Sequence, residues 1–177
     1  PPEEILALTF TNKAADEMRK RLEGRALSLP YISTFHSLAY DILSQHGALP
    51  FQNEEPDFDA LLSSLKQLLL EQTDVLKIIQ DRFRFISVDE YQDTSPIQAD
   101  ILSLLGARHQ NVCVIGDPNQ AIYGFRGATL ENFFLFDTRF PNPLEISLSK
   151  NYRSHPSIQT ASRFLFQFTL PDYVNIG

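Results

Sequence analysis

The chain has 177 residues, of which 43% are hydrophobic, and this is enough for one sizeable core. No apolar run approaches the ~20 residues of a membrane-spanning helix, and no signal peptide is recognisable, so we expect a cytoplasmic protein that is not embedded in a membrane. A single cysteine, Cys113, excludes an internal disulfide and a cysteine metal cluster. We expect it to be a buried strand residue.

Five short apolar runs predict buried strands, at 5–10, 31–33, 85–88, 112–115 and 144–148. Helical patterns separate them, at 12–22, 35–45, 58–79, 96–105 and from about 154–156 to 168. Asn12 and Ser95 are the predicted N-caps of two of these helices, and Pro96 suits a first helical position. Alternating strands and helices predict an α/β fold with a mainly parallel sheet covered on both faces.

The ends of the predicted strands carry polar motifs, as expected for ligand sites in parallel sheets. Asp89 and Glu90 directly follow the run 85–88. In a nucleoside triphosphatase, the first of two such carboxylates binds Mg²⁺ and the second polarises the attacking water. Taken alone, the pair is weak evidence, because most such pairs are solvated loop acids. Polar motifs at ordered distances make the enzymatic interpretation stronger.

Five segments occur in a fixed order: ALTFTNKAA at 7–15, TFHS at 34–37, DEYQD at 89–93, GDPNQAIYGFRGA at 116–128 and NYRS at 151–154. This ordered set resembles the superfamily 1 DNA helicases of the UvrD/Rep/PcrA kind. The resemblance implies a RecA-like, three-layer P-loop NTPase fold with ATP and Mg²⁺ as cofactors. It also implies an ATP-dependent helicase or translocase that moves 3′ to 5′ on single-stranded DNA and unwinds duplexes.

The same resemblance assigns catalytic and nucleotide-binding roles. Asp89 is the candidate Mg²⁺ ligand and Glu90 the candidate general base. Gln120 is expected to hydrogen-bond the γ-phosphate or the attacking water, although a turn-capping amide is the alternative. Tyr152 is expected to stack on the adenine, and Arg153 to reach the γ-phosphate.

The resemblance also implies a track for single-stranded DNA, in which aromatic side chains stack on bases and polar groups bind phosphates. His36 is alternatively a helix cap or a core residue, Tyr123 has core packing as its alternative, and Phe35 is expected in the core. Arg126 is alternatively an interdomain contact or an ion-pair partner of Asp117 or Glu131. The candidate DNA-binding residues are Phe10, Thr11, Asn12, Thr34, His36, Tyr123, Phe125 and Arg126.

The phosphate-binding Gly-x-x-x-x-Gly-Lys-Ser/Thr loop of the family is absent, since none of the seven glycines is followed by lysine. We therefore expect residues 1–46 and 84–177 to form most of the first motor domain, without its first strand and P-loop. Residues 47–83 are expected to form a short helical insertion, a reduced version of the family's subdomain 1B. Expected partners are single-stranded or partly duplex DNA, the missing P-loop segment and the second motor domain of the same protein.

The isolated chain is expected not to hydrolyse ATP. Its net charge of −7 predicts that it binds DNA poorly on its own. Two alternatives remain: the motor part of a helicase–nuclease subunit, and a non-catalytic DNA-binding relic of such a motor.

Overall fold

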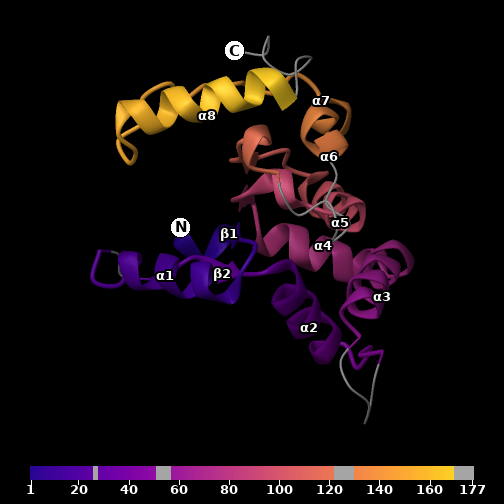
Figure 1. The fold of residues 1–177 in the computed structure, drawn as a ribbon. Coiled ribbons are helices and arrows are strands. Elements are labelled where there is room, and N and C mark those ends of the chain that lie inside the picture. Colours follow the sequence, from indigo (N-terminus) through magenta and orange to yellow (C-terminus); the bar gives the residue numbers. More distant parts are fainter. Residues whose placement is uncertain (26–27, 51–56, 122–129, 170–177) are drawn as a thin grey trace. The chain divides into compact units, whose positions relative to one another are not determined.

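The computed structural model describes residues 1–25, 28–50, 57–121 and 130–169. The chain divides into two compact units, Pro1–Pro141 and Asn142–Gly177 (Figure 1). Among the described residues, none of the helices is both long enough and apolar enough to span a bilayer.

The first unit is built on four parallel strands in the order β2-β1-β3-β4. The strands are β1 (Ile5–Leu8), β2 (Tyr31–Ser33), β3 (Phe85–Val88) and β4 (Val112–Val114). The predicted α/β fold with a parallel sheet is confirmed, and it is consistent with a RecA-like helicase domain.

Helices connect the strands, as parallel pairing requires. The α-helices of the first unit are α1 (Asn12–Leu22), α2 (Phe35–Gln45), α3 (Phe58–Glu71), α4 (Thr73–Arg82), α5 (Pro96–Gly106), α6 (Leu130–Phe134) and α7 (Phe136–Arg139). Short 3₁₀ turns are η1 (Pro2–Glu4), η2 (Tyr91–Asp93) and η3 (Pro118–Gln120), and α8 (Pro156–Thr169) lies in the second unit.

Two details of the helix prediction are wrong. The helix predicted over 58–79 is two helices, because Gln72 leaves the helical conformation (φ −109°, ψ 80°) between α3 and α4. The N-cap of α1 is Thr11 rather than Asn12, since the Thr11 hydroxyl accepts a hydrogen bond from the Ala14 N–H at 3.1 Å. Ser95 caps α5 as predicted, in a reciprocal capping box with Gln98.

Alternation along β1 separates the two faces of the sheet, because successive side chains of a strand point to opposite sides. Leu6 and Leu8 are fully buried in the main core, which α2, α3, α4 and α5 complete. Ala7 points the other way and packs with Ala15 of α1 and Ile32 of β2 in a smaller cluster. The main core therefore lies on one face, and α1 covers part of the other.

This asymmetry explains why Cys113 is exposed, contrary to the prediction that it is buried. In the sheet register Ala7 pairs with Ser87 and Ser87 with Cys113, so all three share the face that α1 covers. The smaller cluster on that face is built on β1 and β2. Cys113 belongs to β4, at the far edge of the described sheet.

The helices α3 and α4 belong to the main core of the first unit. Leu65 and Leu69 of α3 are completely buried in the same cluster as Leu43 of α2 and Leu102 of α5. Their equivalence to a reduced subdomain 1B stays a prediction.

The prediction of a strand at 144–148, in the second unit, is wrong. These residues have no strand conformation, and Leu144 and Leu148 are 85% and 89% exposed. An extended segment becomes a strand only when another strand satisfies its N–H and C=O groups. The described part of the second unit contains a helix, α8, and no strand that could pair with this segment.

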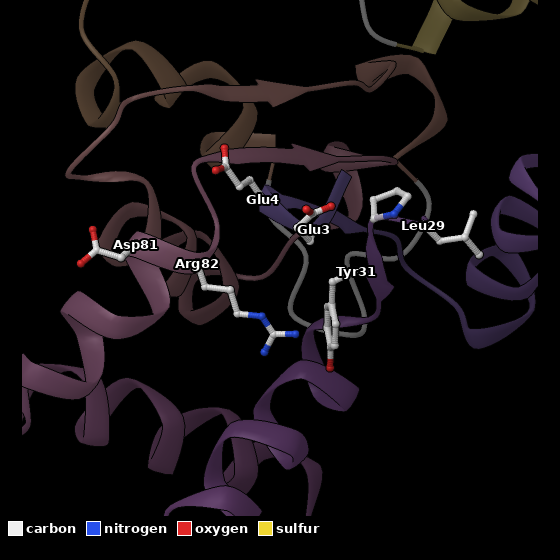
Figure 2. A pocket seen from close by; sticks show the side chains of 7 residues that line it. Glu3, Glu4, Leu29, Tyr31, Asp81 and Arg82 are labelled. Atoms are coloured by element: carbon white, nitrogen blue, oxygen red, sulfur yellow. The ribbon is translucent and has the colours of Figure 1, made fainter. Parts of the chain in front are cut away.

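A pocket of about 390 Å³ lies beside the start of β2 (Figure 2). The guanidinium of Arg82 lies 5.3 Å from the ring centre of Tyr31 and 4.7 Å from that of Phe83. Burial and a hydrogen bond to Asp41 raise the pKa of Tyr31 to about 12. This pocket contains none of the predicted site residues, and Asp89, Glu90 and Gln120 follow the opposite ends of the strands.

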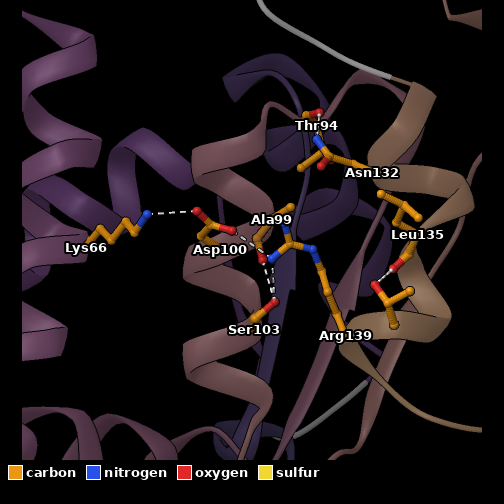
Figure 3. Close-up of polar contacts among 9 residues, drawn as sticks. Lys66, Thr94, Ala99, Asp100, Ser103, Asn132, Leu135 and Arg139 are labelled. Carbon is orange, nitrogen blue, oxygen red and sulfur yellow. Dashed lines mark hydrogen bonds and ion pairs between the residues drawn. The ribbon is translucent and has the colours of Figure 1, made fainter.

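An ionic network fastens α3 and α7 to α5 (Figure 3). Asp100 of α5 accepts hydrogen bonds from Lys66 of α3 at 2.8 Å and from Arg139 of α7 at 2.7 Å. Arg139 also donates to the Ser103 hydroxyl at 3.1 Å. Burial alone would raise the pKa of Asp100, but these two cations outweigh it and lower that pKa.

We predict that Asp100→Asn lowers the free energy of unfolding by about 1 kcal/mol at pH 7. Charge-assisted hydrogen bonds contribute more to the free energy of unfolding when they are buried. Solvent screens the interactions of Asp100 with Lys66 and Arg139, because the Asp100 side chain is 33% exposed. A carboxylate with a lowered pKa in the folded state stabilises the fold above its unfolded pKa, which is about 3.9. The difference between wild type and variant should therefore shrink as the pH falls below that value.

Urea denaturation between pH 3 and pH 7 measures this difference. Asp74→Asn is the matched control, since Asp74 is 93% exposed and its ion pair with Lys77 spans 3.7 Å. Equal losses in both variants would contradict the prediction.

Candidate functional site

The site is built where β1, β3 and β4 end, and backbone hydrogen bonds continue past the strands there. Asp89 N–H donates to the Leu8 carbonyl at 2.9 Å, and Ile115 N–H donates to the Val88 carbonyl at 2.8 Å. Tyr91 N–H then donates to the Ile115 carbonyl at 2.9 Å. The loop after β3 is thus bonded to the end of β1 on one side and to the loop after β4 on the other.

Asp89 is the half-buried carboxylate of this edge. Burial raises its pKa and the charge of Glu90 raises it further, while a backbone hydrogen bond from Glu90 opposes the shift. A nearby cation would stabilise the ionised form of such a carboxylate. Within the described residues, no group of three or more His, Cys, Asp or Glu side chains could hold a metal ion. Mg²⁺ commonly takes one or two carboxylates beside water and phosphate oxygens, so Asp89 fits a single protein ligand.

Glu90 is exposed and adopts a left-handed backbone conformation (φ 54°, ψ 44°). Few non-glycine residues do so. Its carboxylate accepts a hydrogen bond from the Gln92 amide at 2.7 Å. Asp89 and Glu90, although adjacent, therefore have different surroundings. The two roles predicted for them stay predictions.

Gln120 follows β4 in the 3₁₀ turn η3, and its side chain is exposed. Asp117 organises this turn, because its carboxylate accepts from the Asn119 N–H at 3.0 Å and from the Gln120 amide at 2.8 Å. The Gln120 amide is therefore held by a side chain of its own loop, and its carbonyl oxygen has no hydrogen-bond partner among the described residues. Its contact with a phosphate stays a prediction.

The segments after β1 and β2, which carry candidates for the predicted DNA track, lie side by side. Thr9 N–H donates to the Ser33 carbonyl at 3.0 Å. The Thr34 hydroxyl donates to the Ser37 hydroxyl at 3.0 Å, which in turn donates to the Asn12 amide oxygen at 3.3 Å. Thr34 also caps α2, and Thr11 caps α1, so both hydroxyls already have structural roles.

The two aromatic candidates of this track differ in their surroundings. Phe10 is half-buried at the end of β1. His36 lies edge-on to Phe58 of α3, with ring centres 5.4 Å apart. Burial lowers the pKa of His36, although the charge of Asp59 opposes the shift. Phe35 is buried in the main core, as predicted.

Five of the predicted site residues lie outside the described part of the first unit. Tyr123, Phe125 and Arg126 lie outside the described residues. Tyr152 and Arg153 belong to the second unit, where both are exposed and Lys150 lies 5.0 Å from the Tyr152 ring centre. There the Asn151 side chain accepts from the N–H groups of Arg153 and Ser154, a local turn that precedes α8.

Buried polar groups that the sequence analysis did not single out surround the loop after β3. Gln92 is 1% exposed, and its amide contacts both Glu90 and the loop of Asp117. The Thr9 hydroxyl and one Asp93 carboxylate oxygen are buried without a hydrogen-bond partner among the described residues. Gln92 and Asp93 lie inside the DEYQD motif, and their place in this motif is the signal by which the sequence indicates a role for them at the site.

His36 should make stability depend on pH. Its pKa is lowered in the folded state from the ordinary 6.5, so the fold favours the neutral ring. The stabilisation is present above pH 6.5 and is lost as the pH falls through the folded-state pKa. We predict that wild type loses free energy of unfolding between pH 7 and pH 5 that His36→Gln does not lose.

Chemical denaturation at closely spaced pH values tests this, with His46→Gln as the control for replacing an exposed histidine. If the control removes the same pH dependence, burial of His36 is not its cause.

The UvrD/REP helicase N-terminal domain family matches the chain over residues 1–56 and 51–141. ATP-dependent DNA helicase PcrA of Staphylococcus epidermidis is 29% identical over 241 aligned residues, which cover 91% of this chain and 33% of PcrA. PcrA of Staphylococcus aureus matches to the same extent. The chain spans about a third of the length of these relatives.

Proposed function

The chain belongs to the UvrD/REP helicase N-terminal domain family, and from this membership we propose that it is part of the ATP-driven motor of a DNA helicase. In the whole protein this motor moves 3′ to 5′ on single-stranded DNA and separates duplex strands. Its substrates are ATP, with Mg²⁺, and DNA.

One observation carries the proposal: candidates for hydrolysis and candidates for DNA binding follow the same ends of one parallel sheet. They are Asp89, Glu90 and Gln120 for hydrolysis, and Phe10, Thr11, Asn12, Thr34 and His36 for DNA binding. Asp89 N–H is bonded to the last residue of β1, and Thr9, the next residue along, is bonded to the end of β2. A change at the carboxylates can therefore reach the segments after β1 and β2 through the backbone. A motor that couples ATP hydrolysis to movement needs such a connection.

Each candidate residue has a role in this proposal. Asp89 would hold Mg²⁺, which neutralises phosphate charge when bound. Glu90 orients and deprotonates the attacking water, and Gln120 contacts the γ-phosphate. Tyr152 stacks on the adenine and Arg153 binds the γ-phosphate.

The DNA-binding roles extend the proposal to the strand ends and the loop beyond β4. Aromatic side chains stack on bases, and hydroxyl, amide and guanidinium groups bind phosphates. The proposed residues are Phe10, Thr11, Asn12, Thr34, His36, Tyr123, Phe125 and Arg126.

We also propose that residues 47–83 are a shortened insertion. The alignment with PcrA has 241 positions, more than the 177 residues of this chain, so PcrA has additional residues inside the matched region. The family matches the chain in two pieces that overlap at residues 51–56. Both findings support a shorter connection between α2 and α3 than in the relatives.

ATP hydrolysis by the full-length protein, with and without single-stranded DNA, tests the proposed function. We expect DNA-stimulated hydrolysis, with kcat roughly 10²- to 10⁴-fold lower in Glu90→Gln, because the amide cannot accept the proton of the attacking water. The 177-residue chain alone should be inactive, since none of its seven glycines is followed by the lysine of a phosphate-binding loop.

Glu71→Gln is the matched control, since Glu71 is an exposed residue at the end of α3. DNA binding without hydrolysis in wild type would favour the non-catalytic relic. DNA cleavage by the full-length protein would favour the helicase–nuclease.

A further inference from the structure

A buried amide connects the two loops that carry the proposed catalytic groups. The side chain of Gln92 is 1% exposed. Its Nε2 donates to Glu90 Oε2 at 2.7 Å, and its Oε1 accepts from the Asp117 N–H at 3.1 Å. The Gln92 amide is therefore hydrogen-bonded to the loop after β3 through its NH₂ group and to the loop after β4 through its oxygen.

The orientation of this amide is determined by its partners. A carboxylate only accepts hydrogen bonds, and a backbone N–H only donates. Rotating the amide by 180° would place its oxygen against the Glu90 carboxylate and its NH₂ group against the Asp117 N–H. Both bonds would be lost, so a single orientation satisfies the two loops.

Gly116 provides the space for this contact. A Cβ atom at Gly116 would lie 2.6 Å from Gln92 Oε1, 3.2 Å from Gln92 N and 3.0 Å from Phe133 Cε2. A real Cβ does not approach backbone and buried side-chain atoms so closely. Glycine at this position allows the loop after β4 to approach the Gln92 amide.

The connection continues from Asp117 to Gln120. The Asp117 N–H is bonded to Gln92, and the Asp117 carboxylate accepts from the Gln120 amide at 2.8 Å. Hydrogen bonds thus lead from the Glu90 carboxylate to Gln120 by way of Gln92 and Asp117.

We infer that Gln92 is a positioning residue that holds the Glu90 carboxylate in a fixed place relative to the loop of Gln120. Glu90 is exposed, and among the described residues no other side chain donates a hydrogen bond to its carboxylate. Without Gln92 the carboxylate would sample other rotamers in water. The inference rests on the proposed function, in which Glu90 acts on the attacking water.

The test compares variants of the full-length protein in steady-state ATP hydrolysis with saturating single-stranded DNA. Gln92→Leu keeps the volume but removes both hydrogen bonds, and we expect kcat to fall roughly 10- to 100-fold, as a small misplacement of a reacting group does. KM for ATP and the affinity for single-stranded DNA should stay as in wild type. Gln92→Glu should lose at least as much, because it replaces the NH₂ donor with a second negative charge beside Glu90.

Gly116→Ala is an independent variant, which displaces the Gln92 amide without changing it. It should reproduce the fall in kcat. Gln80→Leu is the matched control for removing a buried glutamine, whose amide donates to the Leu104 carbonyl at 2.8 Å. Gly106→Ala is the matched control for an added Cβ, which would lie 2.6 Å from Val112 Cγ2. Both controls should lower the melting temperature and leave kcat unchanged.

The outcomes separate this inference from the proposed function. Wild-type kcat in folded Gln92→Leu or Gly116→Ala, together with inactive Glu90→Gln, would overturn the inference alone. Equal falls in kcat for Gln92→Leu and Gln80→Leu would also overturn it, because the effect would then be loss of stability. No hydrolysis by wild type would overturn the proposed function, and this inference with it.

Discussion

The parallel pairing of β1 with β3 is the interaction on which the rest of the site depends. It places Leu8 beside Val88, and the hydrogen bond from Asp89 N–H to the Leu8 carbonyl continues the pairing by one residue. The carboxylate loop therefore begins where the segment Thr9–Asn12 begins, although about 80 residues of chain separate them. If this register slipped by one residue, Leu6 and Leu8 would turn to the opposite face and leave the main core.

The burial of the two sheet faces is unequal, and this decides which strand residues are exposed. On the main-core face, four helices complete a continuous cluster around Leu6, Leu8, Ile86 and Val88. On the other face, the small cluster of Ala7, Ala15 and Ile32 is confined to β1, β2 and α1. Hydrophobic burial thus fixes the position of the strand ends from one side, while much of the other side stays open to solvent.

Three carboxylates, those of Asp89, Glu90 and Asp93, lie close together in the loop after β3. Asp89 and Asp93 both have raised pKa values, chiefly because of burial and then because of the charge of Glu90. Among the described residues, a neutral amide donates to the Glu90 carboxylate, that of Gln92, and the backbone of Glu90 donates to the Asp89 carboxylate. The Mg²⁺ that we propose for Asp89 would relieve this repulsion. The site differs electrostatically from the ionic network of Asp100, where Lys66 and Arg139 lower the pKa of the carboxylate.

The sequence by itself determined the strands of the first unit, most helix bounds and the α/β class, because local alternation and capping residues encode them. It also predicted correctly that Asp89, Glu90 and Gln120 follow strand ends. Its errors came from non-local causes. Cys113 lies in an apolar run, but whether a strand face is covered depends on distant helices, and the segment 144–148 has the right pattern but no partner strand in the described part of its unit.

Only the tertiary structure decided how the loops after β3 and β4 contact each other. The single hydrogen-bonded orientation of Gln92 and the need for glycine at 116 follow from a close approach between segments 24 residues apart. Hydrogen bonding and steric fit over such separations depend on atomic positions within a few tenths of an ångström. Residue type and spacing do not encode those positions, whereas they do encode hydrophobic period and helix caps.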